Sequence, residues 1–492
     1  MMRPSDAAPA PPPESWITAR RVTRAVADPI ERFMHISASS GIVLLVAAVL
    51  ALVWANSPWG ESYDHLWHTP ITVGIGPWVF EETLHFWIND LLMTVFFLVV
   101  GLEIKREITE GALSSLRRAA LPIAAAVGGM LVPAAIFLML NSSGPGQRGW
   151  GVPMATDIAF AVGVLTLLGK RVPAALRVLL LAVAIIDDIG AILVIAIFYS
   201  SGFDVQGLLP VGGGLLAMIV LKGAGVRSPW IYVVPGLVLC GGFLQLGIHP
   251  TIAGVIAGLL TPAQSWFGKE GFIKTAREAV EEFQQKAEDP ERDDRDLMAP
   301  LQKLALARRE ALSPARSIEH ALHPYVAFGI MPIFALANAG VHLQGMSFAE
   351  PSSLMVMLGI LLGLVVGKPL GIMVLSWLSV KLGLCVLPPG VTWRGLFVLG
   401  ASAGIGFTMA IFIAELAFTG SELLGVAKLG VLVGTAAAGA LALTVGSVVL
   451  PREQPKSITD ISAGDLESTA SYWTGEVPPP KAPTRDGFQV RM

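Results

Sequence analysis

Two adjacent aspartates lie in the middle of a long apolar stretch. Asp187 and Asp188 fall near the centre of residues 179–198, which read LLLAVAIIDDIGAILVIAIF. A helix over these residues is long enough to cross a bilayer, which takes about 20 residues at about 1.5 Å of rise each. An ionised aspartate at that depth costs about 2.5–3.5 kcal/mol on insertion scales. Packing does not require two such residues, so we expect them to bind something.

Two more charged residues lie at comparable depth. Asp157 follows Thr156 in VPMATDIAFAVG, and Lys368 lies within LLGLVVGKPLGIM. Neighbouring side chains on a helix point about 100° apart, so the paired aspartates cannot both face one small ligand. We expect one of Asp187 and Asp188 to pair with Lys368. The other would join Asp157 and the Thr156 hydroxyl as hard oxygen ligands, which suit a small hard cation.

Each of these residues also has a purely structural interpretation. A lone intramembrane aspartate such as Asp157 can be a hydrogen-bonding residue of the fold, and Lys368 can be a structural partner. The adjacent aspartates are much harder to explain in that way. The sequence leaves open whether the lysine and its aspartate carry a proton or only support the fold.

Composition indicates a membrane protein with many spans. The chain is 53% hydrophobic and 14% charged, whereas soluble domains carry about 25% charged residues. A net charge of −3 offers no basic surface for nucleic acid. Cys240 and Cys385 lie among apolar residues without metal-site spacing. We therefore expect no cofactor, no nucleic-acid partner and a lipid bilayer as the surroundings.

Hydropathy predicts an all-α polytopic membrane protein with twelve transmembrane helices. The spans are expected near 36–55, 85–104, 119–140, 152–168, 178–199, 206–222, 230–247, 250–262, 321–341, 354–378, 395–418 and 426–449. Alternate loops are nearly free of Lys and Arg, while the remaining loops carry them. The positive-inside rule therefore predicts that both termini are cytoplasmic.

The segments outside the membrane divide the chain further. We expect a disordered tail over 1–30, eight helices over 31–262, a charged cytoplasmic insertion over 263–318, four helices over 319–450, and a disordered tail over 451–492. Residues 71–80, ITVGIGPWVF, predict a small β-hairpin on the outer side. An isolated hairpin is only marginally stable, so this one is expected to pair with a second copy.

Two of the spans carry residues that interrupt helices. Pro153 precedes Thr156 in the fourth span, and Gly404 and Gly406 lie in the middle of the eleventh. Paired interruptions of this kind indicate an ion site in a secondary transporter. The ends of half-helices offer free carbonyls to a cation and free amides to an anion.

Together these motifs resemble those of the NhaA-type bacterial sodium/proton antiporters. The resemblance rests on VPMATDIAFAVGVL, LAVAIIDDIGAIL, FALANAGV, GKPLGI and GIGFTMAIFIA, and covers about residues 30–450 without most of 263–315. It implies inverted three-helix repeats in which the fourth and eleventh spans cross as discontinuous helices. It also implies electrogenic, pH-regulated exchange of cytoplasmic Na⁺ or Li⁺ for external H⁺ by a homodimer in the bacterial inner membrane.

The resemblance further implies roles for individual residues. Asp188 and Asp157 would bind the Na⁺, assisted by Thr156, and Asp187 would pair with Lys368. The positions that match the family's cytoplasmic pH-sensing region are Glu103, Arg106, Glu107, Glu319, His320 and His323. An ordinary helix-end charge is an equally good interpretation of those six residues.

Three other functions can be weighed against this one. Another cation/proton exchanger of the same fold would share all the motifs. A cation channel would need a repeated filter motif, which the sequence lacks. An intramembrane aspartyl protease would need two catalytic aspartates, and Asp157 and Asp188 nominally qualify, but no GxGD motif accompanies them and Lys368 would have no role. The sequence therefore predicts a transporter and not an enzyme.

Overall fold

A computed structural model describes most of the membrane-embedded part of the chain. The described residues are 39–451 without 77, 201, 203, 227–228, 266–267, 288–293 and 344–349. The predicted tail over 1–30, and all of the predicted C-terminal tail except residue 451, lie outside this range.

The described chain is predominantly helical, and seven of its helical segments are long and apolar enough to cross a membrane. Four of these segments consist of consecutive helices that join without a break in the span. The seven are α4 (Leu84–Phe86) with η2 (Trp87–Leu92) and α5 (Met93–Thr109); α6 (Leu116–Leu140); α8 (Ala174–Phe198); η6 (Val205–Gly207) with α9 (Leu208–Gly223); α14 (Pro314–Tyr325) with η8 (Val326–Ile330) and α15 (Met331–Asn338); α16 (Pro351–Leu362) with η9 (Gly363–Gly367) and α17 (Lys368–Lys381); and α20 (Leu423–Val449).

Three further apolar segments are pairs of helices with a sharp bend between them. The pairs are α2 (Ser39–Ala55) with α3 (Gly60–Trp67), bent by 115°; η4 (Pro145–Met154) with α7 (Ile158–Leu167), bent by 48°; and α18 (Trp393–Ala403) with α19 (Phe407–Ala417), bent by 48°. Two shorter apolar helices, α10 (Pro229–Leu246) and α11 (Thr251–Leu260), complete the set. Each of the twelve predicted spans overlaps one of these segments, and the number of crossings stays a prediction.

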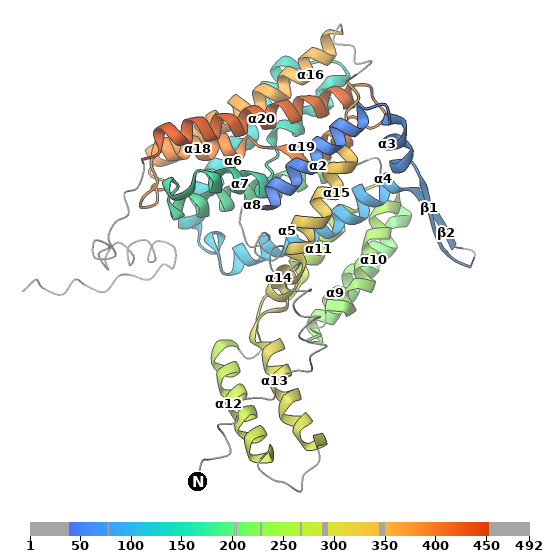
Figure 1. Cartoon of the computed structure of the whole chain (residues 1–492), viewed down its shortest axis with the longest axis vertical. Helices are drawn as coiled ribbons and strands as arrows, with labels where there is room; N and C mark the ends of the chain where they lie inside the picture. The colour runs from blue at the N-terminus through green and yellow to red at the C-terminus, as the bar shows by residue number, and fades with distance from the viewer. Residues whose placement is uncertain are drawn as a thin grey trace, which may run out of the picture.

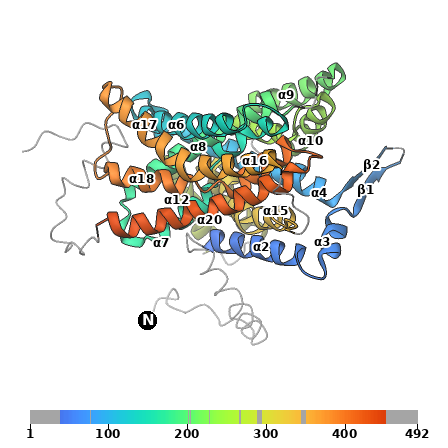
Figure 2. The ribbon, with the colours of Figure 1, turned by 90° about the horizontal axis from the view of Figure 1, so that it is seen from above.

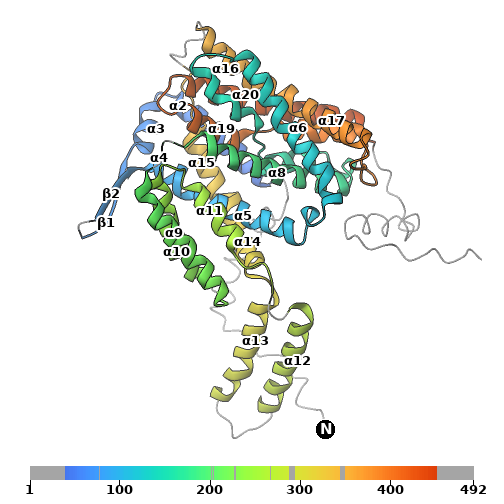
Figure 3. The same ribbon diagram turned by 180° about the vertical axis from the view of Figure 1, so that it is seen from behind.

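The segments between the apolar helices include one small sheet and one helical pair. Strand β1 (Pro70–Ile75) pairs antiparallel with β2 (Trp78–Thr83), and Figure 1 shows the two strands projecting from the side of the bundle. Helix α3, which precedes them, was not predicted from the sequence. Within the predicted insertion, α12 (Gly268–Ala287) packs on α13 (Met298–Ala311), and the two extend away from the other helices in Figures 1 and 3. Three short 3₁₀ turns make up the rest: η3 (Ala112–Ser114), η5 (Gly169–Arg171) and η7 (Asp294–Leu297).

The apolar helices form two groups according to which neighbours they pack against. In the first, which we call the α5 group, α5 packs on α11 and α14, α10 packs on α9 and α11, and α2 and η2 pack on α15. In the second, the α6 group, α6 packs on α8, α16, α17 and η4, and α20 packs on α7, α16, α18 and α19. Figure 2 shows α16, α18 and α20 of the α6 group running alongside one another. The two groups also touch, through α2 with α7, α5 with α8, and α15 with α19.

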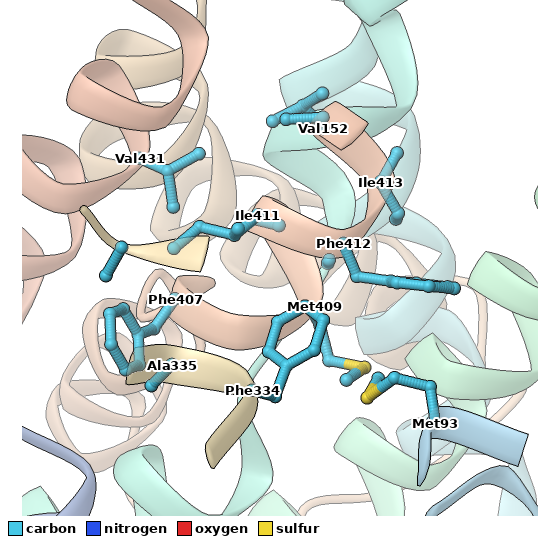
Figure 4. Packing of buried hydrophobic residues seen from close by; sticks show 14 of the residues in the cluster. Met93, Val152, Phe334, Ala335, Phe407, Met409, Ile411, Phe412, Ile413 and Val431 are labelled. Carbon is cyan, nitrogen blue, oxygen red and sulfur yellow. The ribbon is translucent and has the colours of Figure 1, made fainter. Parts of the chain in front are cut away.

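Apolar side chains fill the contact between the groups. Phe412 of α19 lies against Phe97 of α5 and Phe334 of α15, with ring centroids 5.6 and 6.2 Å apart respectively. Figure 4 shows Phe412 and Phe334 with Met93 and Met409 nearby. Contacts between such side chains are not directional, so they tolerate sliding better than hydrogen bonds do.

Within the α6 group, glycines allow the helices to approach closely. A Cβ atom on Gly371 would lie 2.0 Å from the Gly128 carbonyl oxygen, and one on Gly367 would lie 2.9 Å from the Cα atom of Pro133. A side chain at either position would force the helices apart, so these glycines permit the close approach beside Lys368. Lys368 is thereby held in the interior of the α6 group, beside the bent pairs.

Candidate ion-binding site

The two bent pairs of the α6 group touch one another at their breaks. The Asp157 amide donates to the Ile405 carbonyl at 2.8 Å, and the Thr156 hydroxyl lies 3.0 Å from the Ala403 carbonyl. Each break therefore supplies backbone groups to the other, which satisfies polar groups that an interrupted helix leaves open. A Cβ atom on Gly404 would lie 2.3 Å from the Leu364 carbonyl, so this close approach requires glycine.

Asp157 lies between the starts of two half-helices. Its Oδ1 atom accepts from the Phe160 amide at 3.1 Å and so caps α7, while its Oδ2 atom accepts from the Thr408 hydroxyl at 2.6 Å and from the Thr408 amide at 3.3 Å. Helix N-termini favour negative charge because their first amides are free. Asp157 is 1% exposed, so these donors replace water around the carboxylate.

Thr408 was not predicted as a site residue. Its signal in the sequence is weak: a hydroxyl residue two positions after Gly406, where the second half-helix begins. Thr435 of α20 was missed as well, and its hydroxyl accepts from the Phe407 amide at 3.1 Å. These two threonines position the start of α19.

Asp187 and Lys368 form a fully buried ion pair. The Lys368 Nζ atom lies 2.6 Å from Asp187 Oδ2, and neither side chain is exposed. Lys368 also donates to the Thr156 hydroxyl at 2.7 Å, and that hydroxyl lies 2.8 Å from the same Asp187 oxygen. Thr156 therefore bonds to Asp187 and Lys368, whereas the sequence pattern predicts it to be a cation ligand.

The Asp188 carboxylate is buried, and it accepts no hydrogen bond from the described residues. The residue is 3% exposed. It interacts electrostatically with three other acidic residues, Glu103, Asp187 and Asp157, and with Lys368. A carboxylate in this position needs a proton or a cation, because an isolated buried charge is strongly unfavourable.

The residues predicted to sense pH are only partly brought together. Arg106 forms an ion pair with Glu319, and a looser one with Glu107 at 3.9 Å. Glu103 interacts electrostatically with Glu319 and also with Asp188. Glu103 therefore connects this cluster electrostatically to Asp188.

The two histidines near this cluster are exposed. His320 and His323 both face solvent on α14, and no described residue forms a hydrogen bond or ion pair with either. Their predicted role in pH sensing rests only on their position in the sequence.

The site chemistry does not suit a transition metal. Across the described ranges, no three His, Cys, Asp or Glu side chains converge on one point. The oxygen atoms near the two breaks belong to carboxylates, hydroxyls and carbonyls, and such oxygen atoms prefer hard cations.

A model of the family described as Na⁺/H⁺ antiporter 1 matches residues 31–446. The chain belongs to the Na⁺/H⁺ antiporter 1 family. The resemblance drawn from the sequence motifs is thereby confirmed, and the chain is a multi-pass membrane protein of an antiporter family. The match includes both bent pairs of the α6 group and the aspartates described above.

Individual relatives cover almost the whole chain. A Na(+)/H(+) antiporter NhaA 2 of Sorangium cellulosum is 57% identical over 94% of this chain and 98% of its own length. A Na(+)/H(+) antiporter NhaA 2 of Myxococcus xanthus is 55% identical over 89% of this chain and 93% of its own. A Na(+)/H(+) antiporter NhaA of Janthinobacterium is 52% identical over 87% and 94%, respectively.

Proposed function

We propose that the chain exchanges cytoplasmic Na⁺ or Li⁺ for external H⁺ at a site formed by Asp188 and Asp157. The observation that carries this proposal is the buried Asp188 carboxylate, which has no hydrogen-bond donor among the described residues and lies near a second buried carboxylate. Membership in an antiporter family supports the same reaction. A small monovalent cation would neutralise the carboxylates that the protein itself leaves unpaired.

The two aspartates of α8 have different partners, which supports different roles for them. Asp187 is engaged by Lys368 and by Thr156. Asp188 is available to a cation, together with Asp157 across the break. The Thr156 hydroxyl then either stays bonded to Asp187 and the backbone, or turns toward the cation when the cation binds.

Exchange requires that Na⁺ and protons compete for the same oxygens. A buried carboxylate resists ionisation, while a bound cation favours the ionised form. When Na⁺ leaves, protons take its place, and a relative movement of the two helix groups exposes the site to the other side. No covalent step and no cofactor are required, so the chain is not an enzyme.

Electrogenic exchange would be driven by the membrane potential. If more than one proton enters for each Na⁺ that leaves, every net charge moved gains about 2.3 kcal/mol per 100 mV. The direction is Na⁺ out and H⁺ in, for sodium and pH homeostasis in the inner membrane of a bacterium.

The proposed architecture has twelve crossings, with inverted repeats and two crossed discontinuous helices. The bent pairs η4–α7 and α18–α19 are the discontinuous helices, and the contact between Asp157 and the Ile405 carbonyl supports a crossing at their breaks. The basic loops lie in the cytoplasm with both termini. The side of β1 and β2 is then external, and we refer to it as the hairpin side.

Two further properties are proposed for the whole transporter. The chain forms a homodimer through the hairpin at 71–80, where Val73, Val79 and Phe80 expose apolar surface. It is regulated by pH from the cytoplasmic side through the cluster of Glu103, Arg106 and Glu319, which is coupled electrostatically to Asp188.

The experiment that tests the exchange uses everted membrane vesicles with a fluorescent pH indicator. Adding Na⁺ should dequench the dye with the unaltered protein, and Asp188→Asn or Asp157→Asn should abolish the response. Asp204→Asn is the matched control, because Asp204 is exposed and remote from the site. Retained exchange in either site variant, at equal expression, would contradict the site assignment.

A further inference from the structure

A second charged cluster lies at the hairpin side, apart from the ion site. Glu415 of α19 and Lys428 of α20 form an ion pair of 2.5 Å, with 14% and 11% of their side chains exposed. The Nε2 atom of His85 in α4 lies 3.7 Å from the same Glu415 oxygen. The sequence motifs did not single out these residues, and the exchange reaction does not use them.

The cluster joins the two helix groups. Glu415 and Lys428 belong to the α6 group, whereas His85 precedes η2 and α5 in the α5 group. The ion pairs described above stay within one group, since Arg106 and Glu319 both lie in the α5 group and Asp187 and Lys368 both lie in the α6 group. Beside the cluster, the contact between the groups consists of apolar rings such as Phe412 and Phe334 (Figure 4).

His85 is held on its own side by neutral groups. Its Nε2 atom lies 3.1 Å from the Asn338 Oδ1 atom, and the Asn89 amide nitrogen lies 3.3 Å from the same ring nitrogen. Asn338 is fully buried and donates to Asn89 Oδ1 at 2.8 Å. The Asn338 oxygen can accept the Nε2 proton of either the neutral or the protonated ring, whereas the Asn89 amide group can donate only to an unprotonated ring nitrogen.

The contact with Glu415 depends on the charge of the ring. A separation of 3.7 Å is too long for a hydrogen bond, so a neutral His85 adds little across the groups. An imidazolium at the same distance attracts the Glu415 carboxylate electrostatically. Histidine is the side chain whose charge ordinarily changes between about pH 5 and pH 8.

The other charged groups nearby either have partners or belong to the same cluster. Asp90 of η2 interacts electrostatically with His85 and with Glu82 of β2, and pairs with His249 at 3.3 Å. Lys428 and a protonated His85 both stabilise the ionised Glu415 carboxylate, and the Tyr63 hydroxyl of α3 also interacts electrostatically with Glu415. None of these groups links the α5 group to the α6 group as His85 does when it is protonated.

Solvent reaches the cluster at His85 and at Lys428. The His85 side chain is 31% exposed, and Lys428 lines a cavity of about 740 Å³ together with Glu422, Ser421, His342 and Gly340. Protons from the hairpin side can therefore reach the cluster without passing the ion site.

We propose that His85 is a positioning residue for transport, whose protonated ring ties the α5 group to the α6 group through Glu415 and slows opening of the site toward the hairpin side. This inference rests on the proposed exchange, because it assumes that the two groups move relative to one another. An acidic exterior would thereby slow the transporter through a group that lies outside the ion site.

The test measures Na⁺/Na⁺ exchange with radioactive Na⁺ in right-side-out vesicles, at a fixed internal pH and an external pH of about 5.5 or about 7.5. This exchange mode involves no net proton movement, so the rate reports the movement between the two access states. His85→Gln removes the imidazole ring but retains a hydrogen-bonding side chain. We expect this variant to exchange about two- to fivefold faster than the unaltered protein at the acidic pH, and equally fast at the higher pH.

Two further variants test whether the effect passes through Glu415. His85→Arg carries a permanent charge and should be slow at both pH values. Glu415→Gln should reproduce the His85→Gln profile, and the double variant should be no faster than either single one. If Glu415→Gln fails to fold, the opposite shifts of His85→Gln and His85→Arg still decide the question.

The matched control is a second histidine–carboxylate pair on the hairpin side. His342 lies 3.0 Å from Asp64, and both residues belong to segments of the α5 group. His342→Gln should leave the external pH profile unchanged. An equal effect of His342→Gln, or none of His85→Gln, would overturn the inference while the unaltered protein still exchanges Na⁺. Absence of any Na⁺ exchange by the unaltered protein would instead contradict the proposed function.

Discussion

The Lys368 Nζ atom lies 2.6 Å from Asp187 Oδ2, and both side chains are completely shielded from solvent. Only the Thr156 hydroxyl joins them at that oxygen among the described residues. A buried pair of this kind is strongly interdependent, because removal of one partner leaves the other as an uncompensated charge.

Lys368→Gln should therefore destabilise the protein by about 3–5 kcal/mol as long as Asp187 stays ionised. The double variant Asp187→Asn with Lys368→Gln should recover most of the loss, because it leaves no unpaired charge. Thermal unfolding of the purified protein in detergent, compared across the single and double variants, measures both effects. Additive losses in the double variant would show that the two residues do not stabilise one another.

Thr408→Val should weaken Na⁺ binding without abolishing exchange. The Thr408 hydroxyl donates to Asp157 at 2.6 Å, and a hydrogen bond to a charged group contributes about 1.5–3 kcal/mol. We expect the apparent KM for Na⁺ to rise about tenfold or more. Thr444→Val on α20 is the control, because that hydroxyl bonds only to backbone carbonyls of its own helix. An unchanged KM in Thr408→Val would exclude Thr408 from the site.

Gly404→Ala should disrupt the break in α18–α19. The new methyl group would lie 2.3 Å from the Leu364 carbonyl, and a forced shift of this kind costs about 1–3 kcal/mol or more. Gly439→Ala is the matched control, since its Cβ atom would lie 3.8 Å from the nearest atom, on Ile405. Transport and melting temperature should fall in the first variant and stay unchanged in the second. Equal behaviour of the two would mean that the break tolerates a side chain.

The insertion should be dispensable for exchange. The Ala315 amide donates to the Pro262 carbonyl at 3.1 Å, so the two ends of the insertion lie next to one another. Helices α12 and α13 pack on each other, with Lys303 lying 3.3 Å from Glu278 between them. Replacing residues 265–312 by a short Gly/Ser linker should leave the transport rate within about twofold, because loop length has little effect on closure. A pH titration of the same variant shows whether the insertion contributes to regulation.

The hairpin should bring two copies of the chain together. Val79 on β2 is 63% exposed and opposes Gly74 on β1. In a protein without Cys240 and Cys385, Val79→Cys or Val73→Cys should form a crosslinked dimer in membranes. Val448 at the far end of α20 is 83% exposed, more than either hairpin position, and Val448→Cys should stay monomeric. Crosslinking at Val448 but not at the hairpin would contradict the proposed interface.

Sequence reasoning was most successful where the residue types left few choices. Lys368 was the one cation at the depth of the paired aspartates, so its pairing with one of them could be predicted. The choice of Asp187 came from the family resemblance, and the structure has the same pair. The breaks could be predicted from Pro153, Gly404 and Gly406, because these residue types interrupt helices.

The partners of hydroxyl groups could not be predicted in the same way. Thr156 bonds to Asp187 and Lys368 because the backbone turns between η4 and α7, and nothing in the residue order reveals the direction of that turn. Thr408 reaches Asp157 only because the two breaks meet. Residues 145–151 form part of η4 although their polar, glycine-rich pattern has no helical periodicity.

Helix α19 connects the two charged clusters of the molecule. Thr408 at its start holds Asp157, and Glu415, seven residues further along, holds Lys428. Seven residues of helix span about 10 Å, or nearly two turns, so both residues lie on almost the same face. The number of residues between Thr408 and Glu415 therefore sets the distance and the relative orientation of the two contacts. A single residue inserted between Thr408 and Glu415 would rotate one contact by about 100° relative to the other, and α19 could then satisfy either cluster but not both.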